Sequence, residues 1–400
     1  MKKLLFITIL IGIGLTFAPK LSLAWWDSSW FNRRQITFSG VTSTAALTDF
    51  PVAAILNSSR IDYSKTQNSG QDIRFVDSDD TTALNYEIEK WDETATSTVW
   101  VKVPGVASST TDYVWMYYNN TSASDNSTST GVWDSNFKRV YHMKESPSST
   151  SPQLRDSTAN QGHIPSNGDM TLTDLVEGKI DGAWDFDGIN DVVGSSTASS
   201  PIADWQTGAG INVSLWVKNW PPNTGPDGNG KAVFEIYDSV CSGCNANGEI
   251  RVRISSDDYS PYNRVSIKAG RKYSGSEISF SSSAGINTDW HFIDAYFSSS
   301  SGKLYIDGAF SNQDTTITTG AAINMNTTKI GGGNSNGAGY RSPTYSATTI
   351  DEVRVSNNIR SVAWIEAEYK NGADSYTSYG SEETAPVAAP TKKKIIIIED

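Results

Sequence analysis

The sequence predicts an all-β protein built from two tandem β-sandwich domains. Short runs of alternating apolar and polar residues, separated by Gly, Asn, Asp and Ser turns, recur along most of the chain and are typical of strands. Long stretches with helical periodicity are rare, which disfavours an α/β or all-α class. The 400 residues exceed what one hydrophobic core usually supports, so two domains are expected.

The first 24 residues have the pattern of a secretory signal peptide. Lys2 and Lys3 precede an apolar run at 4–18, and small residues flank a cleavage position after Ala24. The run is shorter than the roughly 20 apolar residues of a membrane-spanning helix, and no later segment is apolar enough to span a bilayer. We therefore expect a secreted or cell-surface protein, with the signal peptide removed.

The chain is acidic, with 44 Asp and Glu residues against 32 Lys and Arg residues and a formal net charge of −12. This balance argues against nucleic acid as a partner, because phosphate binding needs clustered positive charge. It leaves carboxylates free to bind cations such as calcium.

The two cysteines, Cys241 and Cys244, are close together in a Cys-Ser-Gly-Cys segment. In an oxidising compartment, a local disulfide bond is the simplest interpretation. A redox or zinc site is the alternative, but zinc needs four ligands. The His residues of the chain (His142, His163 and His291) all lie far from these cysteines in sequence.

The first predicted domain covers residues 25–126. One of its strands alternates cleanly, since the valines between 99 and 103 share one face while Trp100 and Lys102 lie on the other. Strands are expected at 35–38, 52–56, 73–76, 84–89, 98–103 and 113–118.

A polar linker is expected at 127–131, followed by a second domain at 132–381. The last element of this domain is the one convincing helix, at 361–370, with Ser361 as its N-cap. Residues 382–400 are expected to form a disordered tail with an apolar end. Strands are expected at 213–218, 233–237, 250–255, 264–268, 291–297, 303–306 and 350–356.

Motifs of the first domain follow one another in the order seen in a known family. They are WFNRR (30–34), LTDFPV (47–52), QDIRF (71–75), YEIEKW (86–91), VWVKVP (99–104) and YYNN (117–120). On these motifs the segment resembles family 2341 of the domains of unknown function. The resemblance implies a β-rich extracellular module and no established chemistry.

Motifs of the second domain also follow a family order. They are GAWDFDGIND (182–191), VSLWVK (213–218), WHF (290–292), GKLYIDG (302–308), KIGG (329–332) and IDEVRV (350–355). On these motifs the domain is similar to LamG-like, concanavalin A-like jelly rolls. The resemblance implies two antiparallel sheets packed face to face, one of them concave, with variable loops at its rim. We therefore expect the second sandwich to be a concanavalin A-like jelly roll.

The same resemblance implies a structural calcium ion, because jelly rolls of this kind often hold one where the FDG strand meets the IDEV strand. By matching motif, Asp187 and Asp351 are the implied ligands, with Asp185 and backbone carbonyls completing a shell of about 6–8 oxygens. The alternative is that these acids cap turns or pair with Arg354.

Two loop stretches of the second domain have the composition of a sugar-binding site, in which aromatic rings stack on the sugar and amide or charged groups bind its hydroxyls. One begins at Trp220 and the other covers 334–345. By contrast, Trp184, Trp216 and Trp290 lie within strand motifs and are predicted to be core residues. The candidate ligand-binding residues are Trp220, Asn336, Tyr340, Arg341 and Tyr345.

Catalysis is not expected. Concanavalin A-like hydrolases carry paired carboxylates in a Glu-x-Asp-x-x-Glu motif, which occurs nowhere in this chain. Glu87 and Glu89 share a strand face but lie in the other domain. The leading hypothesis is a non-catalytic protein that binds a glycan or glycoprotein through the jelly-roll rim loops. The alternatives are a structural or adhesive surface component assembling through protein contacts, and a polysaccharide-degrading enzyme without a recognised motif.

Overall fold

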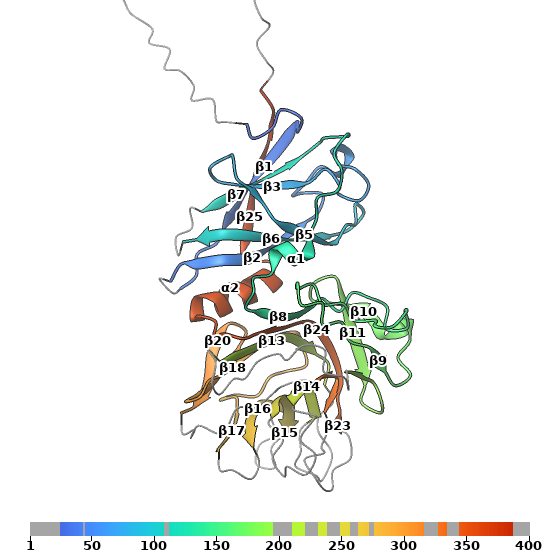
Figure 1. The fold of residues 1–400 in the computed structure, drawn as a ribbon, viewed down its shortest axis with the longest axis vertical. Helices are drawn as coiled ribbons and strands as arrows, with labels where there is room; N and C mark the ends of the chain where they lie inside the picture. Colours follow the sequence, from blue (N-terminus) through green and yellow to red (C-terminus); the bar gives the residue numbers. More distant parts are fainter. Residues whose placement is uncertain are drawn as a thin grey trace, which may run out of the picture.

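The computed structural model describes residues 25–42, 45–107, 112–194, 210–220, 231–237, 249–256, 263–271, 276–315, 327–333 and 344–386. Within these ranges the fold is almost entirely β, in antiparallel sheets that form two sandwiches stacked end to end (Figure 1). The predicted fold class, an all-β chain with two tandem β-sandwiches, is confirmed.

The first sandwich packs a sheet in the order β25-β1-β7-β3-β4 against a smaller sheet in the order β2-β6-β5. Its core includes Phe50, Phe75, Val99 and Val101, so the valine face of β6 points inward as the alternation predicts. The elements are β1 (Asn32–Phe38), β2 (Leu47–Leu56), η1 (Tyr63–Lys65), β3 (Arg74–Asp77), β4 (Ala83–Leu84), β5 (Tyr86–Lys90), β6 (Ser97–Val106) and β7 (Tyr113–Tyr118).

The second sandwich packs a sheet in the order β10-β11-β24-β13-β18-β19-β20, with β8 also pairing β24, against a sheet in the order β17-β16-β15-β14-β21-β12-β9. Apolar side chains from both sheets, such as Trp184, Leu215 and Phe234, share one core. Its elements are β8 (Phe137–Tyr141), β9 (Ser166–Asn167), η2 (Leu172–Asp174), β10 (Leu175–Glu177), β11 (Gly182–Asp187), β12 (Val192–Gly194), β13 (Ile211–Lys218), β14 (Lys231–Tyr237), β15 (Glu249–Ser256), β16 (Asn263–Arg271), β17 (Ser276–Ser281), β18 (His291–Phe297), β19 (Gly302–Ile306), β20 (Ala309–Asp314), β21 (Thr327–Ile330), β22 (Gly332–Gly333), β23 (Thr344–Tyr345) and β24 (Ala347–Ser356).

The connection between the sandwiches is not the free linker predicted at 127–131. It leads into a short helix, α1 (Ser129–Val132), and the backbone N–H of Thr128 donates to the carbonyl of Tyr86 at 2.8 Å. The next side chains, Val132 and Trp133, are buried in the core cluster of the first sandwich. These two residues lie at the predicted start of the second domain, at 132, but they fix the connection to the first sandwich.

The chain returns to the first sandwich at its C-terminal end, through β25 (Thr377–Thr384). This strand pairs antiparallel with β1 and forms the edge of the larger sheet (Figure 1). The sequence predicts that the second domain ends at 381 and that residues 382–384 belong to a disordered tail, and the pairing with β1 contradicts both predictions. The strand is polar and partly exposed, as edge strands often are, so it carries no hydrophobic signal.

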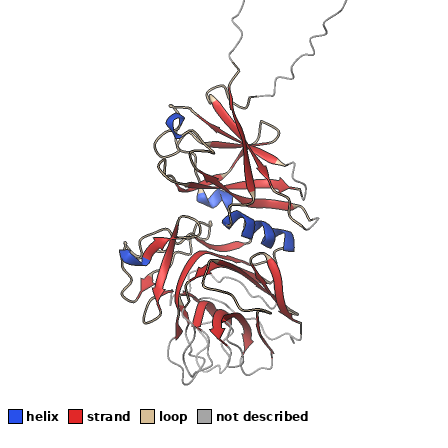
Figure 2. Ribbon diagram, turned by 180° about the vertical axis from the view of Figure 1, so that it is seen from behind, coloured by secondary structure: helices blue, strands red, loops and turns tan. Residues whose placement is uncertain are grey.

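Helix α2 (Val362–Gly372) lies between the sandwiches (Figure 2). The predicted helix is confirmed, including its cap, since the backbone N–H of Trp364 donates to Ser361 Oγ. On one side the Tyr369 ring stacks on Trp216, and a Cβ at Gly372 would lie 2.5 Å from that indole. On the other side Asn371 Nδ2 donates to the carbonyl of Pro51 in β2 at 2.9 Å. The helix therefore buries the outer face of the β13 sheet and ties it to the first sandwich.

A buried carboxyl group lies beneath this helix. Asp294 in β18 is fully buried and accepts a hydrogen bond from Asn212 Nδ2 at 2.9 Å, while its Oδ2 has no partner among the described residues. Burial, and next the nearby charge of Glu368, raise the pKa of Asp294 well above its ordinary value. Between the unfolded and the folded pKa values, the folded protein therefore holds a proton that the unfolded chain releases.

This difference makes stability depend on pH. Because the folded-state pKa of Asp294 lies above the unfolded value of about 3.9, its contribution to stability decreases as the pH rises from about 4 toward the folded pKa. We expect Asp294→Asn to unfold at a higher temperature than the wild type near pH 8, with the difference shrinking toward pH 4. Thermal denaturation at both pH values checks this, and an unchanged difference would contradict it.

Candidate functional site

The structure does not bring the predicted calcium ligands together. Asp187 accepts hydrogen bonds from the backbone N–H groups of Ile189 and Asn190, so it caps a turn. Asp351 is fully buried and accepts from the backbone N–H groups of a different loop, 179–180. The β11–β24 register is the reason, because Asp187 lies opposite Ala347 and Asp351 is therefore displaced along its strand.

Asp185 binds the hydroxyl of Thr349 instead of joining Asp351. The predicted set of Asp187, Asp351 and Asp185 is therefore wrong as a single shell. Asp187 instead lies in an acidic turn with Asp169 and Asp191, whose carboxylate oxygens are all within 4.8 Å of one another. Of the three predicted ligands, only Asp187 belongs to this acidic turn. Calcium binding itself stays a prediction.

The predicted ligand-binding residues are only partly described. Trp220 is 3% exposed and belongs to the core of the second sandwich, which contradicts its predicted place at an exposed rim. Asn219, which has a φ of 57°, lies between β13 and Trp220, and beyond this turn the indole packs into the core instead of the rim. Tyr345 is half-buried in β23. The remaining predicted residues lie outside the described part of the chain: Asn336, Tyr340, Arg341 and the disulfide candidates Cys241 and Cys244.

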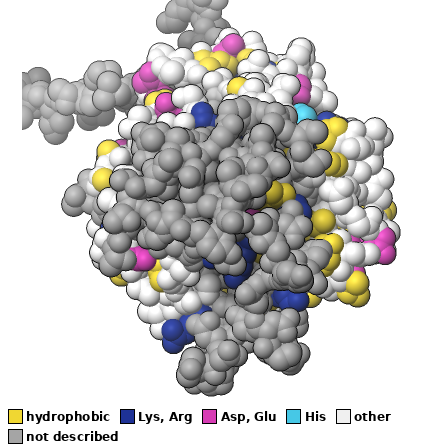
Figure 3. All heavy atoms as spheres, turned by 60° about the horizontal axis from the view of Figure 1, so that its bottom comes forward, with side chains coloured by type: hydrophobic (Ala, Val, Ile, Leu, Met, Phe, Trp, Pro, Cys, Tyr) yellow, Lys and Arg dark blue, Asp and Glu magenta, His cyan; other side chains and the backbone are white. Residues whose placement is uncertain are grey.

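Figure 3 shows the end of the second sandwich that faces away from the first. Among the described atoms of this face, Lys and Arg side chains lie near the middle of the view and hydrophobic side chains gather on its right. The core prediction holds for Trp184 and Trp216, which are buried, whereas Trp290 is only partly buried.

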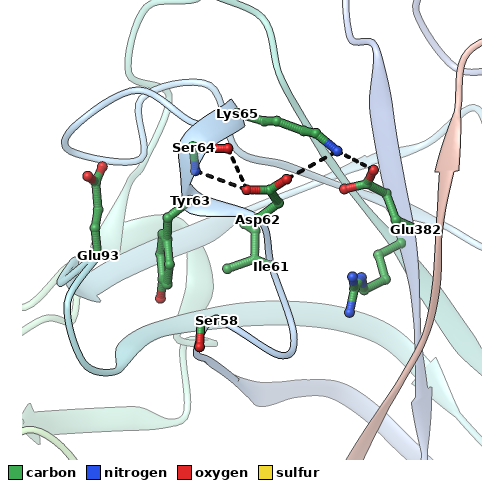
Figure 4. A pocket seen from close by; sticks show the side chains of 9 residues that line it. Ser58, Ile61, Asp62, Tyr63, Ser64, Lys65, Glu93 and Glu382 are labelled. Atoms are coloured by element: carbon green, nitrogen blue, oxygen red, sulfur yellow. Dashed lines mark hydrogen bonds and ion pairs between the residues drawn. The ribbon is translucent and has the colours of Figure 1, made fainter.

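A polar pocket opens on the first sandwich beside β25, and we call it the β25 pocket (Figure 4). Its volume is about 480 Å³. Lys65 Nζ lies 3.2 Å from Asp62 Oδ2 and 2.5 Å from Glu382 Oε1, so one lysine joins the η1 turn to the last strand. The lining residues are Arg34, Ser58, Ile61, Asp62, Tyr63, Ser64, Lys65, Glu93 and Glu382.

The ionisable groups of the β25 pocket stabilise one another in their charged forms. The hydrogen bond from Ser64, and then the one from Lys65, lower the pKa of Asp62. The hydrogen bond to Glu382 raises the pKa of Lys65. Burial would raise the pKa of Glu382, but hydrogen bonds from Lys65 and Tyr118 lower it on balance. At neutral pH the pocket therefore presents fixed positive and negative charges.

Sequence reasoning could not find this pocket, because Glu382 comes from the segment predicted as a tail. The local signal was the Asp62-Tyr63-Ser64-Lys65 segment, which combines an aromatic residue with charged and hydroxyl groups. A partner more than three hundred residues away has no signature in one sequence.

A second group of ionisable side chains is buried where the sandwiches meet, and we call it the interdomain charged cluster. It contains Glu87 and Glu89 from β5, His142 just after β8, and Glu352 and Arg354 from β24. His142 Nδ1 lies 2.7 Å from Glu352 Oε1 and 3.3 Å from Glu89 Oε2. Its imidazole stacks on the Trp100 ring at a centroid distance of 5.9 Å. Both sandwiches thus contribute charges to one solvent-excluded site.

The carboxylates of this cluster titrate differently. Burial raises the pKa of Glu89 to about 8, because the opposing charge of His142 does not compensate for it. Burial also acts on Glu87, but the charge of His142 and hydrogen bonds from Trp133 and Ser157 lower its pKa to about 2. For His142 burial favours the neutral form, yet the surrounding carboxylates raise its pKa well above the usual value. The charges of the cluster therefore act on one another inside a solvent-excluded site.

One family model matches part of the chain. Residues 69–146 match the family model described as a domain of unknown function (DUF2341), which overlaps the second half of the predicted first domain and extends beyond its predicted end at 126. No curated protein matches the chain.

Several solved structures are similar to the chain at low identity. The binding domain of botulinum neurotoxin serotype G gives a TM-score of 0.39 at 13% identity, covering 58% of this chain and 50% of that one. The binding domain of Paraclostridial Mosquitocidal Protein 1 gives 0.40 at 13%, covering 59% and 52%. Domain 4 of AbnA, an extracellular arabinanase from Geobacillus stearothermophilus in complex with arabinotriose, gives 0.37 at 15%, covering 58% and 97%. The chain thus spans about half the length of the first of these structures.

Among the described residues, none of the helices has the length and apolar character needed to cross a bilayer.

Proposed function

We propose that this chain is a secreted or cell-surface protein that binds a glycan or glycoprotein without transforming it. The β25 pocket is the observation that carries the proposal. It is open to solvent and combines the Tyr63 ring with a lysine, an arginine and carboxylates. Sugars are bound by this combination, because an aromatic ring packs on the apolar face of the sugar while charged groups bind its hydroxyls.

The charge states in the pocket favour binding over hydrolysis. A glycoside hydrolase needs one carboxyl group with a raised pKa to protonate the leaving group. Asp62 and Glu382, however, both have lowered pKa values. The described carboxyl groups whose pKa values are raised well above normal, such as Asp294 and Asp351, are fully buried and cannot reach a polymer.

We also assign the second sandwich to the LamG-like, concanavalin A-like jelly rolls. The motifs that carry the resemblance lie mainly on strands of one of its sheets, β11, β13, β19 and β24, and the KIGG motif reaches β21 of the facing sheet. Under this assignment the rim loops around 334–345 form a second place for a glycan, in addition to the β25 pocket.

A glycan array probed with the full mature chain tests the proposal. We expect Lys65→Gln to weaken binding by about tenfold or more, since hydrogen bonds to charged groups contribute about 1.5–3 kcal/mol each. Lys231→Gln is the matched control, because Lys231 is an exposed lysine at the start of β14 in the other sandwich. Lys65 itself is partly exposed, so its replacement leaves the fold intact.

Three results separate the possibilities. Binding that is lost in Lys65→Gln and kept in Lys231→Gln places the glycan in the β25 pocket. Binding that survives Lys65→Gln and is lost in Tyr340→Ala places it at the jelly-roll rim. If no glycan binds the wild-type chain, or if a bound polysaccharide is cleaved, the proposed function is wrong.

A further inference from the structure

The interdomain charged cluster contains three ligand atoms in the arrangement of a metal site. Nδ1 of His142 and one carboxylate oxygen each of Glu89 and Glu352 all lie within 4.8 Å of one another. The His142 and Glu352 side chains are 2% and 1% exposed, and the Glu89 side chain is completely buried. A divalent ion with bonds of about 2.0–2.2 Å holds neighbouring ligand atoms about 3.3 Å apart. The observed 3.3 Å between Nδ1 and Glu89 Oε2 matches this spacing, whereas the 2.7 Å between Nδ1 and Glu352 Oε1 is a hydrogen bond that an ion would replace with a wider spacing.

Two buried polar atoms of the cluster have no hydrogen-bond partner among the described residues. They are Oε1 of Glu89 and Nε2 of His142. An unpaired buried oxygen on a carboxylate is costly, because neither water nor a donor replaces its lost hydration. Glu89 Oε2 is already bound by the Trp100 indole N–H, so the free oxygen is available to a further ligand.

The charges in the cluster are also unbalanced. Three carboxylates, on Glu87, Glu89 and Glu352, surround His142, and the nearby guanidinium of Arg354 also pairs with Glu368. Once Glu89 is ionised, as a metal ligand must be, even a protonated imidazole leaves this buried site with an excess of negative charge. A divalent cation in place of the imidazole proton supplies the missing positive charge and a partner for Glu89.

We propose that the interdomain charged cluster is a structural divalent-metal site, with His142 Nδ1 and the carboxylates of Glu89 and Glu352 as its protein ligands. One imidazole with two carboxylates suits Zn²⁺ and, among other first-row ions, Mn²⁺. A second carboxylate oxygen or a water completes the coordination. The ligands come from both sandwiches, since Glu89 belongs to β5 and Glu352 to β24. The ion therefore pins the interface between them.

Glu87 lies beside the ring nitrogen of His142 that would not bind the ion. Its Oε2 lies 3.5 Å from His142 Nε2, on the opposite side of the ring from Nδ1. Metal-bound imidazoles usually donate their second N–H to a carboxylate, which orients the ring and strengthens the metal bond. Ser157 and Trp133 hold this carboxylate in place by hydrogen bonds of 2.7 and 2.8 Å. With the ion bound at Nδ1, Glu87, His142 and the metal would form a carboxylate–histidine–metal triad.

Metal analysis of the untagged full chain tests this site. The protein is unfolded in the presence of a chelator, refolded with Zn²⁺ alone or without metal, dialysed, and assayed for bound metal and Tm. We expect about one Zn²⁺ per chain and a Tm several degrees higher than that of the metal-free protein. Glu89→Gln and His142→Gln should lose the ion, whereas Glu87→Gln should weaken its binding by about 10–100-fold.

Two matched controls keep the result interpretable. Asp187→Asn alters the acidic turn of the second sandwich, and Glu93→Gln alters an exposed acid of the first; both should retain the ion. Because a ligand variant could fail to fold, the Co²⁺ form of the wild-type chain is examined as well. Its visible spectrum should show the d–d bands of Co²⁺ bound in a low-symmetry site, which differ from those of the free aqueous ion.

Several outcomes overturn the proposal. One is a folded wild-type chain that retains no Zn²⁺ after refolding and shows no Tm shift. The His142–Glu352 contact would then be an ordinary hydrogen bond. Another is a metal that is lost in Asp187→Asn and kept in Glu89→Gln, which places it at the acidic turn. Neither result depends on whether a glycan binds, so failure of this site is distinguishable from failure of the proposed function.

Discussion

Removing residues 377–400 is expected to destabilise the first sandwich by about 4 kcal/mol or more, although these residues lie far from its other strands in sequence. The deletion removes β25 and leaves β1 as an exposed sheet edge. It also takes away Glu383, which accepts from Arg33 Nε at 2.9 Å, and Tyr379, whose hydroxyl donates to the carbonyl of Ile55. Arg33 is 1% exposed, so the lost partner leaves a buried charge under-compensated.

Urea denaturation of three chains, covering 25–400, 25–386 and 25–376, measures this effect. The 25–386 chain is the control, because it keeps all of β25 and lacks only the residues beyond it. We expect equal denaturation midpoints for the first two chains and a much lower midpoint, or failure to fold, for the third. Equal midpoints for all three chains would show that β25 contributes nothing to the first sandwich.

Replacing Arg354 with methionine should cost about 3–5 kcal/mol, since removing one partner of a buried ion pair leaves an uncompensated buried charge. Its guanidinium donates to Glu352 Oε2 at 2.5 Å and to Glu368 Oε1 at 2.7 Å, and it also lies 4.5 Å from the centre of the Trp100 ring. Methionine keeps much of the apolar contact with Trp100 but none of the charge. The double variant Arg354→Met/Glu368→Gln should recover part of the loss, because it removes one stranded carboxylate.

Arg60→Met is the matched control for this substitution. Arg60 also pairs with a carboxylate, Asp374, at 2.7 Å, but both side chains are partly exposed. Exposed pairs contribute only up to about 1 kcal/mol. Chemical denaturation of both variants compares the two sites directly. Similar losses in the two variants would mean that burial of Arg354 at the interface has no energetic consequence.

Elements with one uniformly apolar face, or with a recognisable helix cap, could be predicted from the sequence. The β6 valines and the Ser361 cap of α2 are local signals, and the structure confirms both. The alternation also hinted at the interface, because Trp100 is a large apolar residue on the face opposite the valines. That face proved to be buried by the second sandwich. A period-two pattern reports which residues share a face but not what covers it.

The elements and sites that escaped prediction depend on contacts between distant segments. β25 is polar along its length, and only its pairing with β1 makes it part of the fold. Glu87 and Glu89 were recognisable as neighbours on one face, but His142 and Glu352 come from other strands. The calcium ligands were inferred by matching motifs, and the β11–β24 register then placed Asp351 away from Asp187. The register of two strands is set by the assembled sheet, so it cannot be read from a single sequence.

Differential scanning calorimetry of the 25–386 chain tests most directly whether the two sandwiches behave as one structural unit. The shared strand β25, the anchoring of α2 on β2 and the interdomain charged cluster predict one endotherm, with equal calorimetric and van't Hoff enthalpies. Two resolved endotherms, with the first sandwich unfolding while the second stays folded, would contradict this coupling.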